Sequence, residues 1–355
     1  LNVRKGVKWN NGDDFTADDV ARNIEMWCDK AVEGNSMAAR MSSLVDPDTG
    51  KAGANAIKVV DSHTIQLTCN SSDITIIAGM ADYPAAVVHS SFDPATMASG
   101  SVGTGPFVLE SHEVGVKSVS VKNEGFDWWG YSAGRECPLD RIEYIDYGTD
   151  PAAWLAAAEA DEVDCFYENV GEYVDVMEGI GWENSEIATG STILIRPNQT
   201  TPDADGNTVY ADKRVRQALA MAVDNNICLE LGYANKGAPA DNHHAGSMHP
   251  EHDPSVGRLP YDPAKAKALM AEAGMADYEH ELISIDDDWR KNTTDAVAAQ
   301  LRDAGIKVKR TILPGSTFWN DWAKYPFSST NWNHRPFAVQ VWGLAYRSGE
   351  AWNEM

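Results

Sequence analysis

A chain of 355 residues with 43% hydrophobic residues is long enough for two or three lobes and apolar enough to fill their interiors, which excludes a disordered protein. Its formal net charge of -24 at pH 7 argues against nucleic acid as a partner, because phosphate backbones bind clusters of Lys and Arg. The sequence contains no apolar run long enough to cross a bilayer.

The first half of the chain predicts strands and hairpins around one early helix. Alternating apolar residues indicate a strand at residues 1–9, and Thr16 marks the start of a helix. Further strands are expected as a pair within residues 56–68, as a hairpin at residues 107–114 and 116–121, and at residues 141–147. Between them, Asp82, Tyr83 and Pro84 interrupt an apolar segment, and we expect a loop there that faces a cleft.

The second half predicts helices that begin at aspartates and alternate with strands. Asp150 indicates a helix that continues to Ala160, and a strand at residues 193–198 leads into a polar linker at residues 199–210, where we place a lobe boundary. The remaining expected elements are a helix after Asp212, a helix at residues 227–231, a helix from Asp262 to Gly274, a helix at residues 295–304 ended by Gly305, and a strand at residues 306–313. This alternation predicts an α/β half with short parallel connections.

Tryptophans concentrate near the end of the chain, where residues 316–353 hold five of the twelve. The charged side chains of this segment are mostly basic, and guanidinium groups with indole rings are typical of a pocket for a small, partly apolar ligand that can carry a negative charge. The candidate ligand-binding residues of the segment are Trp332, Asn333, His334 and Arg335 as the pocket floor, with Arg347 and Trp352 as further candidates. Trp319 and Trp322, three positions apart, are more typical of a helix face in a core.

A long loop at residues 238–260 carries His243, His244, His249 and His252. Imidazoles bind zinc, nickel and copper, but this spacing matches no compact metal motif. We therefore expect neither a metal nor a cofactor, and predict that the loop caps the cleft with His243 and His244 as ligand contacts. A solvated loop without ligand contact and a metal-carrying receptor are the alternatives. The acid triplet at residues 286–288 is interpreted as a solvated turn before a helix.

The five cysteines show no CxxC pair and no metal-type spacing. Cys137 and Cys165 flank one predicted strand and helix and could pair, which the sequence alone leaves open.

Four segments, in this order, resemble the family 5 extracellular solute-binding proteins, which are the peptide-type receptors of ABC importers. They are residues 5–20 (KGVKWNNGDDFTADDV), 103–107 (GTGPF), 212–224 (DKRVRQALAMAVD) and 260–274 (PYDPAKAKALMAEAG). The resemblance implies an α/β, two-lobed periplasmic-binding-protein fold of class II, cluster C-like, with an extra subdomain in the first lobe. The expected division is residues 1–98 for the subdomain, 99–198 for the first-lobe core and 199–355 for the second lobe. It also implies that a leader, an early strand and a final stretch of the family pattern lie outside this chain.

The resemblance further implies a monomeric receptor, periplasmic or anchored outside the cytoplasm by a lipid. Such a receptor closes over a peptide or other small molecule and delivers it to permease subunits without changing it. Asp82 and Tyr83 would face the Trp332 segment from the first lobe. Peptide receptors of this type place an acid after the pocket tryptophan to pair with the ligand's amine, whereas this chain has Arg335, which favours an anionic ligand. A secreted hydrolase with an aromatic-lined cleft is the alternative from another class, although no spacing marks its carboxylate pair.

Overall fold

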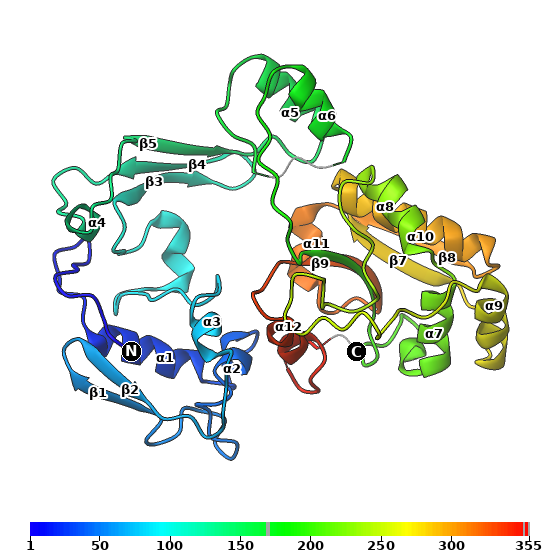
Figure 1. Ribbon diagram of the computed structural model, residues 1–355, viewed down its shortest axis with the longest axis horizontal. Helices are drawn as coiled ribbons and strands as arrows, with labels where there is room; N and C mark the ends of the chain where they lie inside the picture. Colours follow the sequence, from blue (N-terminus) through cyan, green and yellow to red (C-terminus); the bar gives the residue numbers. More distant parts are fainter. Residues whose placement is uncertain (168–170, 351, 354–355) are drawn as a thin grey trace. The chain divides into compact units, whose positions relative to one another are not determined.

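The computed structural model of the protein describes residues 1–167, 171–350 and 352–353. The chain divides into two compact units, Leu1–Gly148 and Thr149–Met355, and each combines helices with strands (Figure 1). The predicted α/β class is confirmed, and we describe each unit by itself.

The first unit contains two small antiparallel sheets. β1 (Ile57–Asp61) pairs with β2 (Thr64–Leu67), and β4 (Lys117–Lys122) lies between β3 (Phe107–Glu113) and β5 (Arg141–Ile145). The helical segments are α1 (Ala17–Trp27), α2 (Met37–Arg40), α3 (Ile76–Met80), the 3-10 helix η1 (Pro94–Ser99) and α4 (Trp129–Ser132). The predicted strand pair, hairpin and following strand are therefore confirmed.

Helix α1 begins where the sequence predicts, because the backbone N–H of Thr16 donates to Asp19 Oδ2 at 3.1 Å. The apolar side of α1, with Ile24 and Trp27, packs into the core of the first unit against residues of α2 and α3. This helix needs no partner other than its own unit to bury its apolar side.

The predicted strand at residues 1–9 is wrong. Asn2 and Lys8 form only isolated bridges, with Thr64 and Asp14 respectively. The alternation that suggested a strand comes from a segment whose side chains alternate between core and solvent while its backbone lacks a continuous partner strand.

The second unit is built on a four-stranded sheet in the order β6-β9-β7-β8. Its strands are β6 (Thr192–Pro197), β7 (His280–Ile285), β8 (Val308–Leu313) and β9 (Phe327–Trp332). β7 is parallel to both β8 and β9, whereas β6 is antiparallel to β9. The predicted parallel connection is confirmed for β7 and β8. Strand β6, which the predicted division assigns to the first lobe, pairs within this sheet, and the three-part division as a whole stays a prediction.

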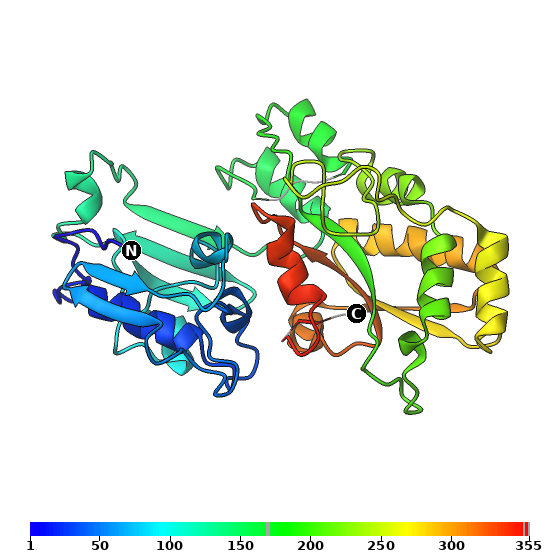
Figure 2. The ribbon, with the colours of Figure 1, turned by 60° about the horizontal axis from the view of Figure 1, so that its bottom comes forward.

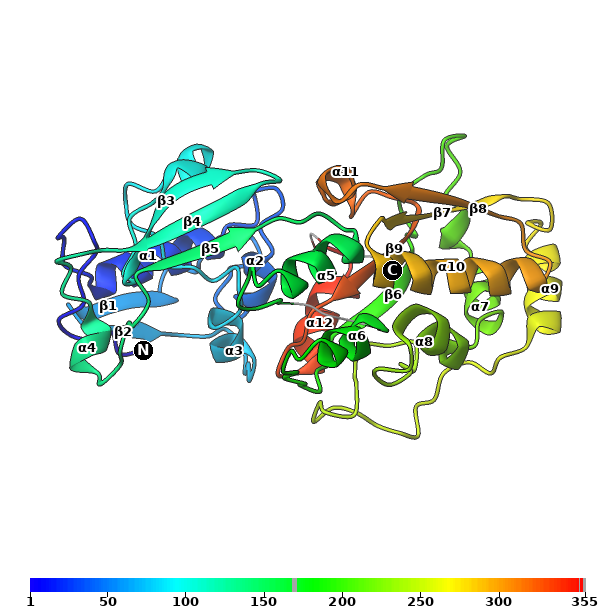
Figure 3. The same cartoon turned by 90° about the horizontal axis from the view of Figure 1, so that it is seen from above.

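Helices surround this sheet. In the described ranges they are α5 (Pro151–Glu159), α6 (Tyr173–Gly179), the 3-10 helix η2 (Val209–Ala211), α7 (Lys213–Met221), α8 (Asn225–Tyr233), α9 (Pro263–Glu272), α10 (Asp288–Asp303), α11 (Gly315–Asp321) and α12 (Ala338–Ala345). α7 and α9 lie side by side (Figure 2), and α10 packs on α8 and on strands β7 and β8 (Figure 3). The shared core lies between these helices and the sheet.

Aspartate begins most of the longer helices of the second unit. Side-chain oxygens of five aspartates accept a backbone N–H in the first turn of α5, α7, α8, α9 and α10, namely Asp150, Asp212, Asp224, Asp262 and Asp287. Each carboxylate satisfies an unpaired N–H and complements the helix dipole. The predicted starts at Asp150, Asp212 and Asp262 are confirmed. Gly274 and Gly305, with φ of 75° and 81°, follow α9 and α10 in the left-handed conformation that ends helices.

All five cysteines are free thiols. Cys137, which is buried, lies in the first unit, and Cys165, which is exposed, lies in the second. The pairing that the sequence left open is not formed in this structure.

Candidate functional site

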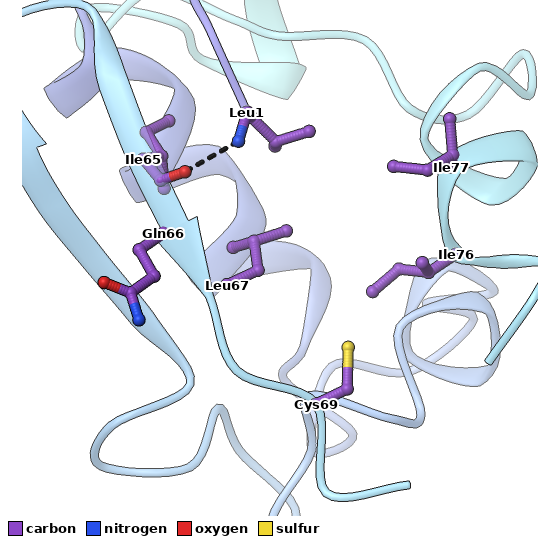
Figure 4. Close-up of a pocket in the computed structure, with 7 residues that line it drawn as sticks. All are labelled: Leu1, Ile65, Gln66, Leu67, Cys69, Ile76 and Ile77. Atoms are coloured by element: carbon purple, nitrogen blue, oxygen red, sulfur yellow. Dashed lines mark hydrogen bonds between the residues drawn. The ribbon is translucent and has the colours of Figure 1, made fainter. Parts of the chain in front are cut away.

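The first unit carries a pocket of about 430 Å³ between β2 and α3 (Figure 4). Its lining residues are Leu1, Ile65, Gln66, Leu67, Cys69, Ile76 and Ile77. The pocket is mostly apolar and includes none of the predicted ligand-binding residues. Because ligand sites orient their ligands with a few placed polar groups, we place the candidate site in the second unit.

The candidate site lies where β9 ends. Trp332 is the last residue of β9, opposite Thr192 of the antiparallel strand β6. This pairing fixes the position of Trp332, and the chain then leaves the sheet through Asn333 and His334, which are both exposed. The pairing of β9 with β6 therefore places the predicted pocket floor at one end of the sheet.

Aromatic rings form a continuous chain of contacts around Trp332, which we call the aromatic cluster. Trp352 lies 5.7 Å from both Trp332 and Trp322 between ring centroids, and His244 lies 5.6 Å from both Trp332 and Tyr346. The ring of Trp332 is only 5% exposed. The cluster brings together three predicted residues, Trp332, Trp352 and His244. It also includes Trp322, which the sequence assigned to a core.

Arg335 is also 5% exposed, and its guanidinium turns back on its own chain. Its Nη1 donates to the carbonyl oxygens of Asn333 and His334 at 3.2 and 3.0 Å. The carbonyl of Arg335 in turn accepts a hydrogen bond from His249 Nε2 at 3.0 Å. A cation in this position holds the turn after β9 and places a positive charge beneath two exposed residues.

Two imidazoles fasten the histidine loop to this turn. The rings of His249 and His334 stack with centroids 5.7 Å apart. Backbone N–H groups of Gly246 and Gly190 donate to their Nδ1 atoms at 2.9 and 3.1 Å, so each ring carries a lone pair at Nδ1. Burial, His249 and Arg335 lower the pKa of His334. This lowered pKa favours the neutral form of His334.

His243 and His244 are consecutive in the loop but occupy different surroundings. His244 is buried against the aromatic cluster, and burial, with His243 and His249, lowers its pKa from 6.5 to about 4. His243 lines a separate pocket beside α7. His244 and His249 bring the loop onto the Trp332 segment, whereas capping of a cleft by the loop and ligand contact by His243 or His244 stay predictions.

Asp82, Tyr83 and Arg347 are the other predicted residues. Asp82 belongs to the first unit, where it forms a buried ion pair with Arg40 at 2.7 Å, and the neighbouring Tyr83 is 68% exposed. Arg347 is exposed, 3.9 Å from Glu350. A role of Asp82 and Tyr83 opposite Trp332 stays a prediction.

Sequence reasoning missed two residues of the site. Arg196, the charged residue of β6, is fully buried with its guanidinium 4.5 Å from the ring centroid of Trp322 and donates to the Trp322 carbonyl at 2.6 Å. A lone charge inside an apolar strand was the available signal. Glu251 accepts from the backbone N–H groups of Ala338 and Val339 at 3.2 and 3.3 Å, and so caps α12.

Side chains suited to metal binding do not gather around the cluster in the described part of the chain. In the parts of the chain that the structure describes, no three His, Cys, Asp or Glu side chains gather closely enough to hold a metal ion. Of the acid triplet, Asp287 caps α10 and pairs with Arg290, and Asp288 lies 3.4 Å from Lys291. A helix does begin at the triplet, but the predicted solvated turn is wrong for Asp287, which is 8% exposed, and Asp288 is already the first residue of α10.

The sequence matches one protein family over almost its whole length. The family described as bacterial extracellular solute-binding proteins, family 5 middle, matches residues 1–352, and the chain belongs to this family. The resemblance seen in the sequence is therefore confirmed. In the described part of the chain, no helix combines the length and the apolar character that a membrane span requires.

Two curated proteins are similar to this chain in sequence. The chain is 27% identical to heme-binding protein A of Haemophilus influenzae over 299 residues, covering 77% of this chain and 50% of that protein. It is 24% identical to the dipeptide-binding protein of Escherichia coli over 293 residues, covering 78% of this chain and 52% of that protein. The chain thus spans about half the length of these curated relatives.

A solved structure shows the same fold. The substrate-binding domain of an oligopeptide ABC transporter from Bacillus anthracis superposes with a TM-score of 0.80 at 21% identity, covering 100% of this chain and 71% of that one. This likeness confirms the predicted α/β fold of the two-lobed periplasmic-binding-protein type.

Proposed function

We propose that this protein is the substrate-binding receptor of an ABC importer. It captures a peptide-like or other small solute with an anionic group between two lobes and hands it, unchanged, to permease subunits. Family membership supports this proposal, as do relatives named for binding dipeptides and heme. The receptor works as a monomer in the periplasm or on a lipid anchor outside the cytoplasm.

The observation that carries the proposal is the aromatic cluster with Arg335 at the end of β9. Indole faces supply apolar contact area at small conformational cost, and three of them meet here through Trp332, Trp322 and Trp352. Trp332 is buried in the cluster, so the partly exposed rings of Trp322 and Trp352 are the faces that a partly apolar ligand can contact.

Charge sets the expected selectivity. The buried guanidinium of Arg335 lies under Asn333 and His334, whose exposed side chains offer polar contacts to a solute. A cation shielded from water attracts anions more strongly than an exposed one. A solute with a carboxylate therefore binds here better than one whose only charge is an ammonium.

Two peptides of similar size test this selectivity. N-acetyl-trialanine carries a carboxylate and no ammonium, whereas trialanine amide carries an ammonium and no carboxylate. Isothermal titration is expected to show about 10-fold tighter binding of the acetylated peptide, the effect of one charge-assisted hydrogen bond. Tighter binding of trialanine amide, or failure of both peptides to bind, would overturn the proposed ligand class.

Variants of Arg335 test whether this residue causes the preference for the acetylated peptide. Arg335→Ala is expected to abolish the preference for the acetylated peptide, and Arg335→Lys, which keeps the charge, to retain part of it. Arg302→Ala is the matched control, because Arg302 also donates to a carbonyl, that of Val308 at 3.1 Å, but lies outside the aromatic cluster. Equal losses in Arg302→Ala and Arg335→Ala would contradict a direct role for Arg335.

A further inference from the structure

A second pocket of the same unit, of about 390 Å³, is lined mainly by basic and amide side chains, and we call it the basic pocket. One wall is a stripe of α7 formed by Lys213, Arg216 and Gln217, together with Ala220. These positions are three and four residues apart and so share one face of the helix. The opposite wall comes from the two ends of the histidine loop, with Asn242, His243 and Arg258.

Positive charge in this pocket is largely uncompensated. Among the described residues, neither Lys213 nor Arg258 forms an ion pair with a carboxylate. Asp241 is the acid among the lining residues, and its Oδ2 lies 3.8 Å from His252 Nε2. Asp212, just before α7, pairs with Arg214 at 2.6 Å and also interacts electrostatically with Arg216, so Arg216 is the partly compensated cation of the three. In a chain with a net charge of -24, three clustered cations are an exception to the overall balance.

The structure holds one cation of the pocket in place. Nη1 of Arg216 donates to the carbonyl oxygens of Tyr210 and Ala211 at 2.8 and 3.0 Å. These bonds fix the guanidinium at the helix start and leave its remaining N–H groups for other acceptors. A positioned guanidinium loses less conformational entropy on binding than a mobile one.

Neutral donors complete the lining. The Oδ1 of Asn242 accepts from Asn225 Nδ2 at 2.9 Å, so its own amide nitrogen remains a donor. The backbone N–H of Ala245 donates to His243 Nδ1 at 3.2 Å, which puts the proton of the neutral ring on Nε2. Donors therefore predominate over acceptors in this pocket.

From this geometry we propose that the basic pocket is a second ligand site, which binds a free solute bearing several anionic oxygens. Phosphate groups and clustered carboxylates share this chemistry, since both accept hydrogen bonds from guanidinium and ammonium groups. The volume suits a small molecule, and the strongly negative net charge disfavours an anionic membrane as the partner. The site lies beside α7 and is independent of the function proposed for the aromatic cluster.

Titration with inorganic phosphate, pyrophosphate and citrate tests the proposal and distinguishes phosphate from carboxylate. Sodium chloride keeps the ionic strength equal in each titration, and circular dichroism verifies the fold of each variant. Saturable binding of one of the three anions is expected, and Arg258→Ala or Lys213→Ala should weaken it about 10-fold through loss of a charged hydrogen bond. Lys309→Ala is the matched control, because Lys309 is exposed and paired with Glu281 at 2.9 Å.

Each outcome of these titrations either supports or overturns the second ligand site. Affinity unchanged in Lys309→Ala but weakened in the pocket variants supports the site, whatever the fate of the proposed transport function. Absence of saturable binding of all three anions would overturn it. Equal weakening in Lys309→Ala would also overturn it, because the binding would then follow only the net charge.

Discussion

The aromatic cluster and the basic pocket lie on two sides of one loop, and consecutive histidines enter them. His244 is buried among rings, and His243 lines a pocket with arginine and lysine side chains. The backbone bends at residues 242–244, so these neighbouring side chains enter different surroundings and one loop serves two chemically different surfaces. The comparison teaches that the histidine loop is not one site: the aromatic cluster depends on packing, and the basic pocket on charge.

The largest expected effect is on the packing of the aromatic cluster. Trp332→Ala should lower the free energy of unfolding by about 3–5 kcal/mol, because it removes a buried indole and leaves a cavity. Urea denaturation followed by circular dichroism measures this loss. Trp319→Ala, whose ring is 43% exposed, should cost at most about 1 kcal/mol. Similar losses in both variants would show that Trp332 is not part of a packed cluster.

Acid should destabilise the aromatic cluster through His244. Its pKa is lowered to about 4 in the folded protein, from a usual value of 6.5. The unfolded chain therefore binds more protons between these values, so the contribution of the neutral ring is complete above about pH 6.5 and is lost as the pH falls toward 4. The loss is about 3 kcal/mol.

The variant His244→Phe should show a correspondingly shallower fall in stability between pH 6.5 and 4. His280, buried beside Tyr210, has its pKa lowered to about 4 by burial as well, and so His280→Phe is a second case of the same effect in a place remote from the loop. An identical pH dependence in the wild type and His244→Phe would argue against a neutral buried His244.

Removal of the cap on α12 should have a smaller effect. Glu251→Ala loses the acceptor for the N–H groups of Ala338 and Val339, which should cost about 1 kcal/mol. Glu230→Ala, an exposed position on α8, is the control and should change stability by less than about 0.5 kcal/mol. Thermal unfolding measures the stability of both variants. Equal stabilities would show that Glu251 does not help to hold the loop.

The smallest effect on stability should come from the basic pocket. Lys213→Ala removes an exposed cation without an ion-pair partner among the described residues, so the free energy of unfolding should change by less than about 0.5 kcal/mol. Chemical denaturation at low and high salt checks this. A loss above about 2 kcal/mol, of the size expected for buried groups, would mean that this pocket also depends on packing.

Much of the fold was predictable because local signals agree with the tertiary structure. Aspartate caps at Asp150, Asp212 and Asp262 gave three helix starts, and Gly274 and Gly305 gave two ends. The central strand β9 was not predicted. Its Ser328, Ser329 and Thr330 are all buried, so its composition is polar although it lies between two strands, and neither alternation nor apolarity marks it.

Part of the candidate site could also be predicted from the sequence. Trp332, Arg335 and Trp352 were found from composition, because indole and guanidinium groups are conspicuous in an acidic sequence. The contact of Trp332 with His244 could not be deduced, since it depends on how a long loop crosses the end of a sheet strand. The separation of His243 from His244 likewise depends on backbone direction, which residue type does not encode.

Native mass spectrometry of the purified protein tests most directly whether the aromatic cluster binds a solute. The wild type is expected to retain a small co-purified molecule with an anionic group, and Asn333→Ala/His334→Ala, which alters only exposed side chains of the turn after β9, is expected to lose most of it. Retention of the same molecule at equal occupancy by both proteins, or its absence from the wild type, would contradict a ligand site at this end of the sheet.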